Sequence, residues 1–328
     1  MPLRRPADLV RPHFLRPWLL SLPLLLLNAC GGSAATSATE SRPVQPAAGT
    51  GAAETGDGGG SPSSPGIRLP DPDDLALPQP GLLNAAWPPS RNFDLSRWKL
   101  TLPSAEEVQA VVLNSGYAYA DVFFTDRRSG GLVFRCPNKA RTTANSSYSR
   151  TELREMRVPD GPAHASANNW RMAEGGELTA TLRIDRVSTT GEAKKVGRVV
   201  IGQIHGDDSE PIRLYFDKKP GEARGRLYAR MDNAANSTDT QSPDIVGNGG
   251  DGGLALGELF SYRIRLQDRA LSVEVRRLDG RLHLYETLID PNFAGDKLYF
   301  KAGVYNQNNT GDSADYVQAT FFALAARH

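Results

Sequence analysis

The chain contains 328 residues, and its 38 lysines and arginines are nearly balanced by 37 aspartates and glutamates. This balance excludes the strong overall positive field that is typical of nucleic-acid-binding proteins, so an anionic partner would have to be met by a local basic patch. The length is sufficient for one large folded domain in addition to a terminal extension.

The first residues have the pattern of an export signal. Four arginines, Arg4, Arg5, Arg11 and Arg16, precede an apolar run over residues 18–27. A membrane-spanning helix needs roughly twenty apolar residues, so a run of about ten predicts the core of a secretory signal rather than a membrane anchor. We therefore expect the protein to be exported.

The apolar run ends in the motif LNACG at residues 27–31, which resembles the lipobox of bacterial lipoproteins. The resemblance implies that residues 1–29 are a lipoprotein-type signal peptide and that Cys30 becomes lipidated, as the protein's sole attachment to a membrane. Asn28 stands where the lipobox usually has a small residue. The alternative to lipidation is ordinary signal-peptide cleavage, after which the protein is secreted. Gly31, in place of the Asp that retains lipoproteins at the inner membrane of enteric bacteria, implies the outer membrane.

Residues 30–84 have the composition of a tether. They are rich in Gly, Ala, Ser, Thr and Pro, with hardly an aromatic side chain. Such a segment cannot bury enough apolar surface to offset the entropy lost on ordering, which predicts a disordered linker. We interpret Asp71, Asp73 and Asp74 as solvated linker residues rather than a calcium site.

Residues 85–328 are long enough to form one all-β domain with a full core. Once Cys30 is set aside, Cys136 is the remaining cysteine, so no disulfide can form within the domain. Cys136 lies in a β-like run over residues 131–136, which predicts a buried, inert thiol rather than a nucleophile.

The domain opens with a predicted strand over residues 92–103, followed by a predicted short helix over residues 104–112 with Ser104 as its N-cap. Turn signals such as Thr190-Gly191 separate the later strands. Those strands are runs rich in β-branched and aromatic residues, at 178–187, 198–204, 212–216, 226–231, 260–266, 271–278, 283–289, 298–305 and 316–324. Many short strands with hardly any helical period predict an antiparallel β-sandwich of jelly-roll type.

Three of the strands carry a polar face. Because side chains alternate along a strand, every second residue shares one face. A single charged row of this kind normally faces bulk water. Three such rows with apolar residues behind them predict instead a concave cleft above a packed core. The polar rows are Arg150, Glu152 and Arg154 on the first strand, Gln203 and His205 on the second, and Tyr299, Lys301, Gly303, Tyr305 and Gln307 on the third.

The residue types in these rows exclude several chemistries. The five histidines of the chain show no metal-ligand spacing, so we expect no metal site and no cofactor. The Gly-x-Ser-x-Gly motif of serine hydrolases does not occur in the sequence. A glycosidase would need a second carboxylate opposite Glu152, and the other two polar rows contain none. A cationic cleft with one His and one Tyr suits a polyuronate, because cations stabilise the dianion formed when the proton at C5 is removed. The expected reaction is β-elimination.

Three sequence blocks, at residues 150–155, 203–205 and 299–307, resemble the signature blocks of the family 7 polysaccharide lyases, which are alginate lyases with a β-jelly-roll fold. Residues 93–103 also resemble the opening strand of that family, so the resemblance extends over about residues 93–324. It implies an enzyme that acts on alginate. Another polyuronate, such as glucuronan, and a non-catalytic carbohydrate-binding jelly roll are the alternatives.

The resemblance also implies roles for individual residues. Arg150 and Gln203 would neutralise the uronate carboxylate, His205 would remove the C5 proton of guluronate, and Tyr305 would serve as acid, and for mannuronate also as base. Ile204, between the Gln and the His, accompanies activity on guluronate-containing blocks in that family. We expect a monomer whose other cleft residues bind the substrate, namely Glu152, Arg154, Tyr299, Lys301 and Gln307.

Overall fold

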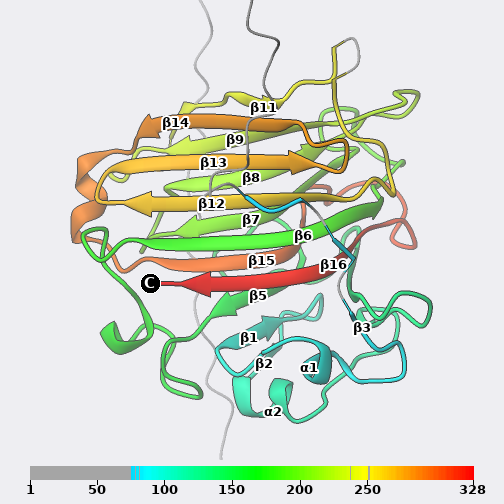
Figure 1. Cartoon of the computed structure of the whole chain (residues 1–328), viewed down its shortest axis with the longest axis horizontal. Helices are drawn as coiled ribbons and strands as arrows, with labels where there is room; N and C mark the ends of the chain where they lie inside the picture. Colours follow the sequence, from blue (N-terminus) through cyan, green and yellow to red (C-terminus); the bar gives the residue numbers. More distant parts are fainter. Residues whose placement is uncertain (1–74, 78, 81, 237, 250–251) are drawn as a thin grey trace, which may run out of the picture. The chain divides into compact units, whose positions relative to one another are not determined.

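The computed structural model describes residues 75–77, 79–80, 82–236, 238–249 and 252–328. Two antiparallel β-sheets pack face to face in this part of the chain, as a β-sandwich of jelly-roll type (Figure 1). The predicted signal peptide, Cys30 and most of the predicted linker lie outside the described residues. The predicted boundaries of these segments therefore remain predictions.

The first sheet has nine strands among the described residues, in the spatial order β10-β9-β8-β7-β15-β5-β1-β2, with β11 also pairing with β9. In this sheet β15 lies between β7 and β5. The bounds are β1 (Trp98–Thr101), β2 (Glu107–Val108), β5 (Arg150–Glu155), β7 (Arg198–His205), β8 (Ile212–Asp217), β9 (Arg226–Asp232), β10 (Asp239–Gln241), β11 (Asp244–Val246) and β15 (Tyr299–Asn306).

The second sheet has seven strands among the described residues, in the spatial order β14-β13-β12-β6-β16-β4-β3. Its strands are β3 (Phe123–Thr125), β4 (Leu132–Pro137), β6 (Gly176–Arg186), β12 (Phe260–Gln267), β13 (Ala270–Arg277), β14 (Leu282–Leu288) and β16 (Tyr316–Arg327). The described residues also form four short helical segments: α1 (Pro89–Asn92), which precedes β1, and α2 (Ala110–Asn114), η1 (Ser166–Asn168) and η2 (Pro291–Gly295), which lie between strands.

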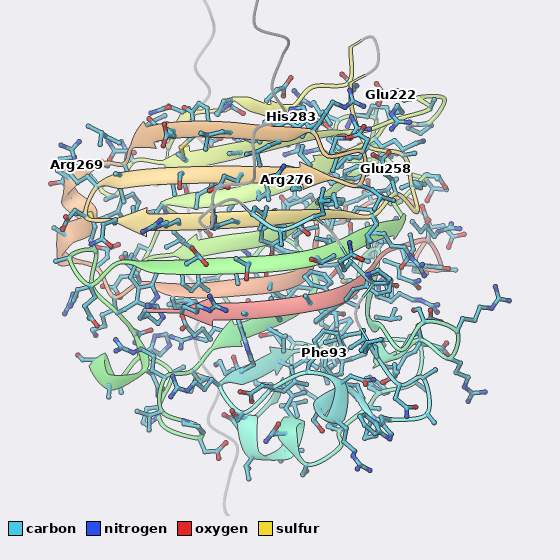
Figure 2. All side chains as sticks on the ribbon, in the orientation of Figure 1. Phe93, Glu222, Glu258, Arg269, Arg276 and His283 are labelled. Carbon is cyan, nitrogen blue, oxygen red and sulfur yellow. The ribbon has the colours of Figure 1, made fainter. Side chains whose placement is uncertain are left out.

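The core lies between the two sheets. Alternating residues of β6, β12 and β16, such as Leu182, Ile264 and Phe321, meet residues of β7 and β15 such as Ile201 and Phe300, and all are buried. Burying one such side chain contributes about 1.5–3 kcal/mol relative to exposure. Figure 2 shows the side chains of the described residues on the sandwich, with Arg276 labelled on β13.

The predicted all-β fold is confirmed, and the nine predicted strands from 178–187 to 316–324 correspond within a few residues to β6–β9 and β12–β16. The short strands β10 and β11 were not predicted. The predicted helix over residues 104–112 is wrong. Val108 pairs with Leu100 as part of β2, and the helix α2 begins only at Ala110. Pairing with a neighbouring strand outweighs the local preference, since Val108 thereby enters the core.

Cys136 is a buried free thiol, as predicted, and its burial raises its pKa to about 12. The thiolate needed for a nucleophile is therefore strongly disfavoured. None of the helices in the described ranges is long and apolar enough to cross a membrane.

Candidate active site

The three strands with polar faces are direct neighbours, because β15 pairs with β5 on one side and with β7 on the other. Lys301 of β15 lies opposite Arg154 on β5 and Gln203 on β7. Gly303 lies opposite Glu152 with a φ of 138°, and a Cβ atom there would come within 2.6 Å of the Thr151 carbonyl oxygen. Only glycine permits this close approach of the two strands.

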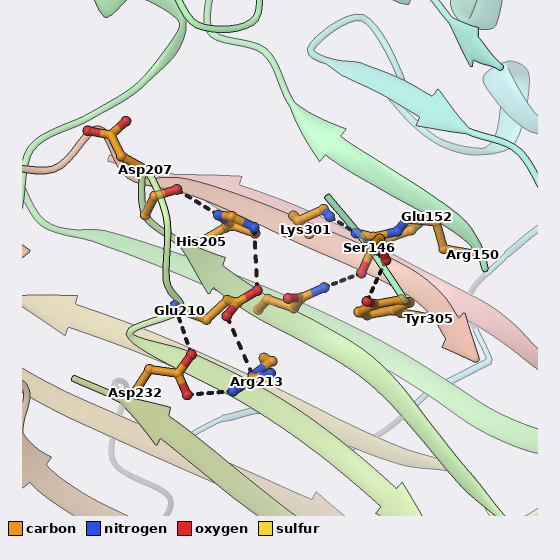
Figure 3. A network of polar contacts seen from close by, with 12 residues as sticks. Ser146, Arg150, Glu152, His205, Asp207, Glu210, Arg213, Asp232, Lys301 and Tyr305 are labelled. Atoms are coloured by element: carbon orange, nitrogen blue, oxygen red, sulfur yellow. Dashed lines mark hydrogen bonds and ion pairs between the residues drawn. The ribbon is translucent and has the colours of Figure 1, made fainter. Parts of the chain in front are cut away.

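Glu152 joins Lys301, Arg150 and Gln203 in one part of the polar network in Figure 3. Its carboxylate lies 2.7 Å from Lys301 Nζ and 3.0 Å from Arg150 Nη1, and it also accepts a hydrogen bond from Gln203 Nε2. Its side chain is 1% exposed. Burial alone would raise the pKa of Glu152, but Lys301 and Arg150 outweigh burial and lower it, so the group is anionic.

Lys301 is equally buried and belongs to the same charge cluster. Burial, together with the neighbouring Arg150, lowers the pKa of Lys301 to about 8, although Glu152 opposes the shift. Below that pH the cluster holds two cations and one carboxylate. The cluster therefore carries an excess of positive charge.

Tyr305 and Arg150 are tied together by Ser146. Ser146 Oγ lies 2.7 Å from the Tyr305 hydroxyl and accepts a hydrogen bond of 2.9 Å from Arg150 Nη2. The Arg150 guanidinium lies over the Tyr305 ring, 3.8 Å from its centroid. A cation against an aromatic face is attracted by the ring quadrupole, so these contacts hold the hydroxyl in one position beside the cationic cluster.

His205 lies at the other end of this network. Its ring stacks on Tyr299 with centroids 5.0 Å apart and an interplanar angle of 11°. Nδ1 lies 2.6 Å from the carbonyl oxygen of Gly206 and donates to it. Burial, with the positive charge of Lys301, lowers the pKa of His205 to about 3, so the imidazole is neutral and can accept a proton at neutral pH.

Two predicted substrate-binding residues have other partners. Arg154 borders the groove, but its guanidinium donates to the carbonyl oxygens of Glu155 and Ala163 at 2.5 and 2.6 Å and to Asn169 Oδ1 at 2.6 Å. Gln307 follows the end of β15, where its backbone N–H donates to the Arg198 carbonyl. The Arg154 guanidinium is thus occupied by groups of the protein, whereas Gln307 Nε2 is buried without a hydrogen-bond partner among the described residues. The predicted substrate-binding roles of both residues remain predictions.

A groove of about 390 Å³ lies above this network. Its rim is partly acidic beyond His205, where Asp207, Asp208 and Glu210 line it. Four basic side chains line it near β1, β5 and β15, namely Lys99, Arg150, Arg154 and Lys301, together with Glu107, which pairs with Lys99 at 2.6 Å. The groove is therefore mainly acidic beyond His205 and mainly basic near β5 and β15. Among the described residues, no group of three or more His, Cys, Asp or Glu could hold a metal ion.

Sequence reasoning missed two residues of the site, Ser146 and Glu210. Ser146 lies in the loop before β5, and nothing in its surroundings distinguishes it from the other serines there. Glu210 lies in the short connection from β7 to β8, five positions after His205. His205 ends one strand, and a short connection to the next antiparallel strand keeps its residues close to that end. The short spacing between His205 and Glu210 is therefore a signal that could have identified Glu210.

The arrangement places a neutral imidazole and a phenol hydroxyl at the two ends of a buried cationic cluster (Figure 3). Such a set can neutralise a bound carboxylate, remove a nearby proton and protonate a leaving oxygen. Ser146 does not have the partner of a serine nucleophile, because its hydroxyl contacts Tyr305, Arg150 and the Tyr148 carbonyl rather than an imidazole.

Comparisons with known proteins identify the family of this chain. The sequence model of the alginate lyase family matches residues 93–328. An alginate lyase of Klebsiella pneumoniae is 38% identical over 298 residues, which covers 78% of this chain and 94% of the relative. The crystal structure of the alginate lyase from Klebsiella pneumoniae gives a TM-score of 0.69 at 36% identity, with 74% of this chain and 98% of that chain covered.

A second solved relative is alginate lyase A1-II', a member of polysaccharide lyase family 7. Its crystal structure gives a TM-score of 0.60 at 28% identity, with 73% of this chain and 98% of that chain covered. A variant of A1-II' was solved in complex with the substrate GGMG, and it matches with a TM-score of 0.61 at 27% identity, covering 74% of this chain and 97% of that chain.

Proposed function

Because the chain belongs to the alginate lyase family and is a polysaccharide lyase, we propose that its groove cleaves alginate by β-elimination with Arg150, Gln203, His205 and Tyr305 as catalytic residues. One observation supports this assignment most strongly. The buried cluster below the groove contains two cations and a single carboxylate, between a neutral imidazole and a phenol hydroxyl. An anionic sugar is the ligand that such a cluster attracts.

The excess positive charge acts on the uronate carboxylate. Arg150 supplies a guanidinium, and Gln203 Nε2 has a second N–H besides the one that it donates to Glu152. Hydrogen bonds to the carboxylate stabilise the dianion that forms as the C5 proton leaves. Glu152 in turn holds Arg150 and Lys301 in place, so that they do not have to reorganise during the reaction.

The elimination then needs one base and one acid. The C5–H bond breaks, its electron pair forms the C4–C5 double bond, and the bond from C4 to the glycosidic oxygen breaks while that oxygen takes a proton from Tyr305. In guluronate the proton and the leaving oxygen lie on opposite sides, and His205 is the base. In mannuronate they lie on the same side, and Tyr305 serves as base and acid.

We propose that the enzyme favours guluronate-containing blocks. Ile204, the residue that accompanies this preference in the family, is fully buried in the core and points away from the groove. Its effect on specificity would therefore be exerted through packing beneath His205 and Gln203. The relative A1-II' binds GGMG, a substrate that contains both sugar types.

The first test is the ultraviolet absorbance of the unsaturated uronate formed from guluronate-rich, mannuronate-rich and mixed alginate blocks, with glucuronan and pectate as controls. We expect a rise on alginate alone. Tyr305→Phe should lower kcat by about 100- to 10,000-fold on every block, because the acid is lost, while alginate binding is retained. A folded Tyr305→Phe variant with full turnover would refute the assignment of the acid.

A separate experiment tests the assignment of His205 as the base for guluronate and Tyr305 as the base for mannuronate. His205→Ala should abolish cleavage of guluronate-rich blocks more completely than that of mannuronate-rich blocks, because only the former route uses the imidazole as base. Equal loss on both blocks in a folded variant would refute this division.

For the exported protein we propose a lipid anchor at Cys30 in the outer membrane, with residues 31–84 as a tether to the catalytic domain. The support is the LNACG motif and the composition of the tether. Cys30→Ser should release the enzyme from the membrane fraction into the soluble fraction. A variant that stays in the membrane fraction would refute the anchor, and a wild type found in the medium would favour secretion.

A further inference from the structure

The connection between β7 and β8 brings an additional carboxylate to the proposed base. Glu210 Oε1 lies 3.4 Å from His205 Nε2, and both side chains are about one-fifth exposed, at 18% and 21%. Figure 3 shows Glu210 directed at the ring from the side opposite the Gly206 carbonyl. No predicted role in the groove accounts for this contact.

The protonation of the imidazole follows from its other contact. The carbonyl oxygen of Gly206 can only accept, so the proton of the neutral ring resides on Nδ1, 2.6 Å away. Nε2 then presents a lone pair, which is the form that a base requires. A lone pair cannot donate to Glu210, so the contact with the carboxylate is weak until Nε2 takes up a proton.

We propose that Glu210 is a positioning residue for guluronate cleavage, which holds His205 and stabilises the imidazolium formed when Nε2 removes the C5 proton. This inference rests on the proposed function of the groove. The proton moves from C5 to Nε2, the electron pair enters the new C4–C5 double bond, and Glu210 remains a carboxylate that accepts the new Nε2–H bond. An interaction that strengthens only during the reaction accelerates the chemical step rather than binding.

Glu210 is itself fixed by the strands behind it. Its Oε2 lies 3.8 Å from Arg213 Nε, and its backbone N–H donates to Asp232 Oδ2 at 3.3 Å. Arg213 also contacts Asp232 at 2.5 Å and Asp239 at 3.0 Å. Burial, and to a lesser extent the nearby Glu210, raise the pKa of Asp232 to about 6. The contacts of Arg213 with Glu210 and Asp232 fix the carboxylate that faces His205.

The positive charges of Lys301 and Arg150 disfavour the imidazolium, and a carboxylate beside Nε2 offsets part of their effect. Lys301 and Arg150 both lower the pKa of His205, and Glu152 only partly offsets them. The charged and titratable groups that face His205 are Lys301 and Tyr299 from β15, Arg150 and Glu152 from β5, and Glu210 from the β7–β8 connection.

The test compares Glu210→Gln with the wild type on guluronate-rich and mannuronate-rich blocks. Gln keeps the shape but removes the charge that would stabilise the imidazolium. We expect kcat on guluronate-rich blocks to fall by about 10- to 100-fold with KM changed less than about twofold, and kcat on mannuronate-rich blocks to fall less than about threefold. Glu210→Asp should recover part of the loss.

Glu222→Gln is the matched control, because this glutamate follows the other end of β8, where it accepts from the Lys219 backbone (Figure 2). It should change neither block by more than about twofold. In the His205→Gln background, Glu210→Gln should cause no further loss on guluronate-rich blocks, since the imidazolium no longer forms.

Three results would overturn the inference: unchanged kcat on guluronate-rich blocks, equal loss on both blocks, or an additional loss in the His205→Gln background. Circular dichroism and thermal unfolding of each variant exclude misfolding as the cause. Absence of unsaturated product from the wild type on every block would instead refute the proposed function itself.

Discussion

Two glutamates on β5, three residues apart, are both buried and serve different regions of the molecule. Glu152 faces the groove and meets Lys301, Arg150 and Gln203. Glu155 points to the other side of the sheet. There it meets His328 at 2.6 Å and accepts hydrogen bonds from the Trp170 indole and the Phe300 backbone.

The difference lies in how completely each charge is balanced. Around Glu155, one histidine and two neutral donors satisfy a single carboxylate within the protein. Around Glu152, two cations share one carboxylate, so a second carboxylate can still be accommodated. Complete neutralisation stabilises the sandwich, and incomplete neutralisation leaves a binding site for an anion.

The largest effect is expected for the Glu155 network. Glu155→Ala leaves two buried N–H groups without an acceptor, so the free energy of unfolding should fall by about 3–5 kcal/mol. Urea unfolding measures this change. Glu174→Ala, which removes a partly exposed ion pair with Arg157, should cost less than about 1 kcal/mol. Equal costs for the two variants would contradict the proposed importance of the closed network.

A smaller effect, on binding rather than on folding, is expected at Glu152. The pKa of Lys301 is already lowered to about 8, and Glu152 is the group that keeps it from falling further. Glu152→Gln should therefore leave Lys301 largely neutral at about pH 8 and raise KM for alginate about tenfold, with recovery toward the wild-type value at about pH 6.

Initial rates at several alginate concentrations and at the two pH values measure this change. The control is Lys301→Met in the Glu152→Gln background. Without an amine at this position, KM should no longer differ between the two pH values. A Glu152→Gln variant with the wild-type KM at both pH values would contradict the charge balance described above.

The smallest effects distinguish His205 and His328 by the sign of their pH dependence. Contact with Glu155 raises the pKa of His328 against the effect of burial, so its stabilising contribution is present below the unfolded pKa and is lost as the pH rises through the folded one. The pKa of His205 is lowered to about 3, so the wild type loses stability as the pH falls from about 6.5 toward 3.

Unfolding curves across this pH range test both signs. His328→Gln should cost about 1 kcal/mol more at about pH 5 than at about pH 9, whereas His205→Gln should lessen the acid-dependent loss by about 1 kcal/mol. The same sign for both variants would show that burial, rather than the partner of each ring, determines the response.

Much of the site could be predicted from alternation within single strands. Arg150, Glu152, Gln203, His205, Lys301 and Tyr305 all lie on one face of adjacent strands, as expected, because the direction of a side chain in a strand is a local property. The contacts of Arg154 could not be predicted. Its partners Ala163 and Asn169 lie in a connection between β5 and β6 that has no regular pattern.

The sequence by itself therefore determined the fold class and the residue types that face the groove. Strand periodicity and turn residues act over a few positions, and they are visible in the chain. The tertiary structure decided which of those residues have free capacity for a ligand. That capacity depends on partners such as Ser146, Glu210 and Asn169, which loops bring into contact, and on the burial that shifts the pKa values of His205 and Lys301.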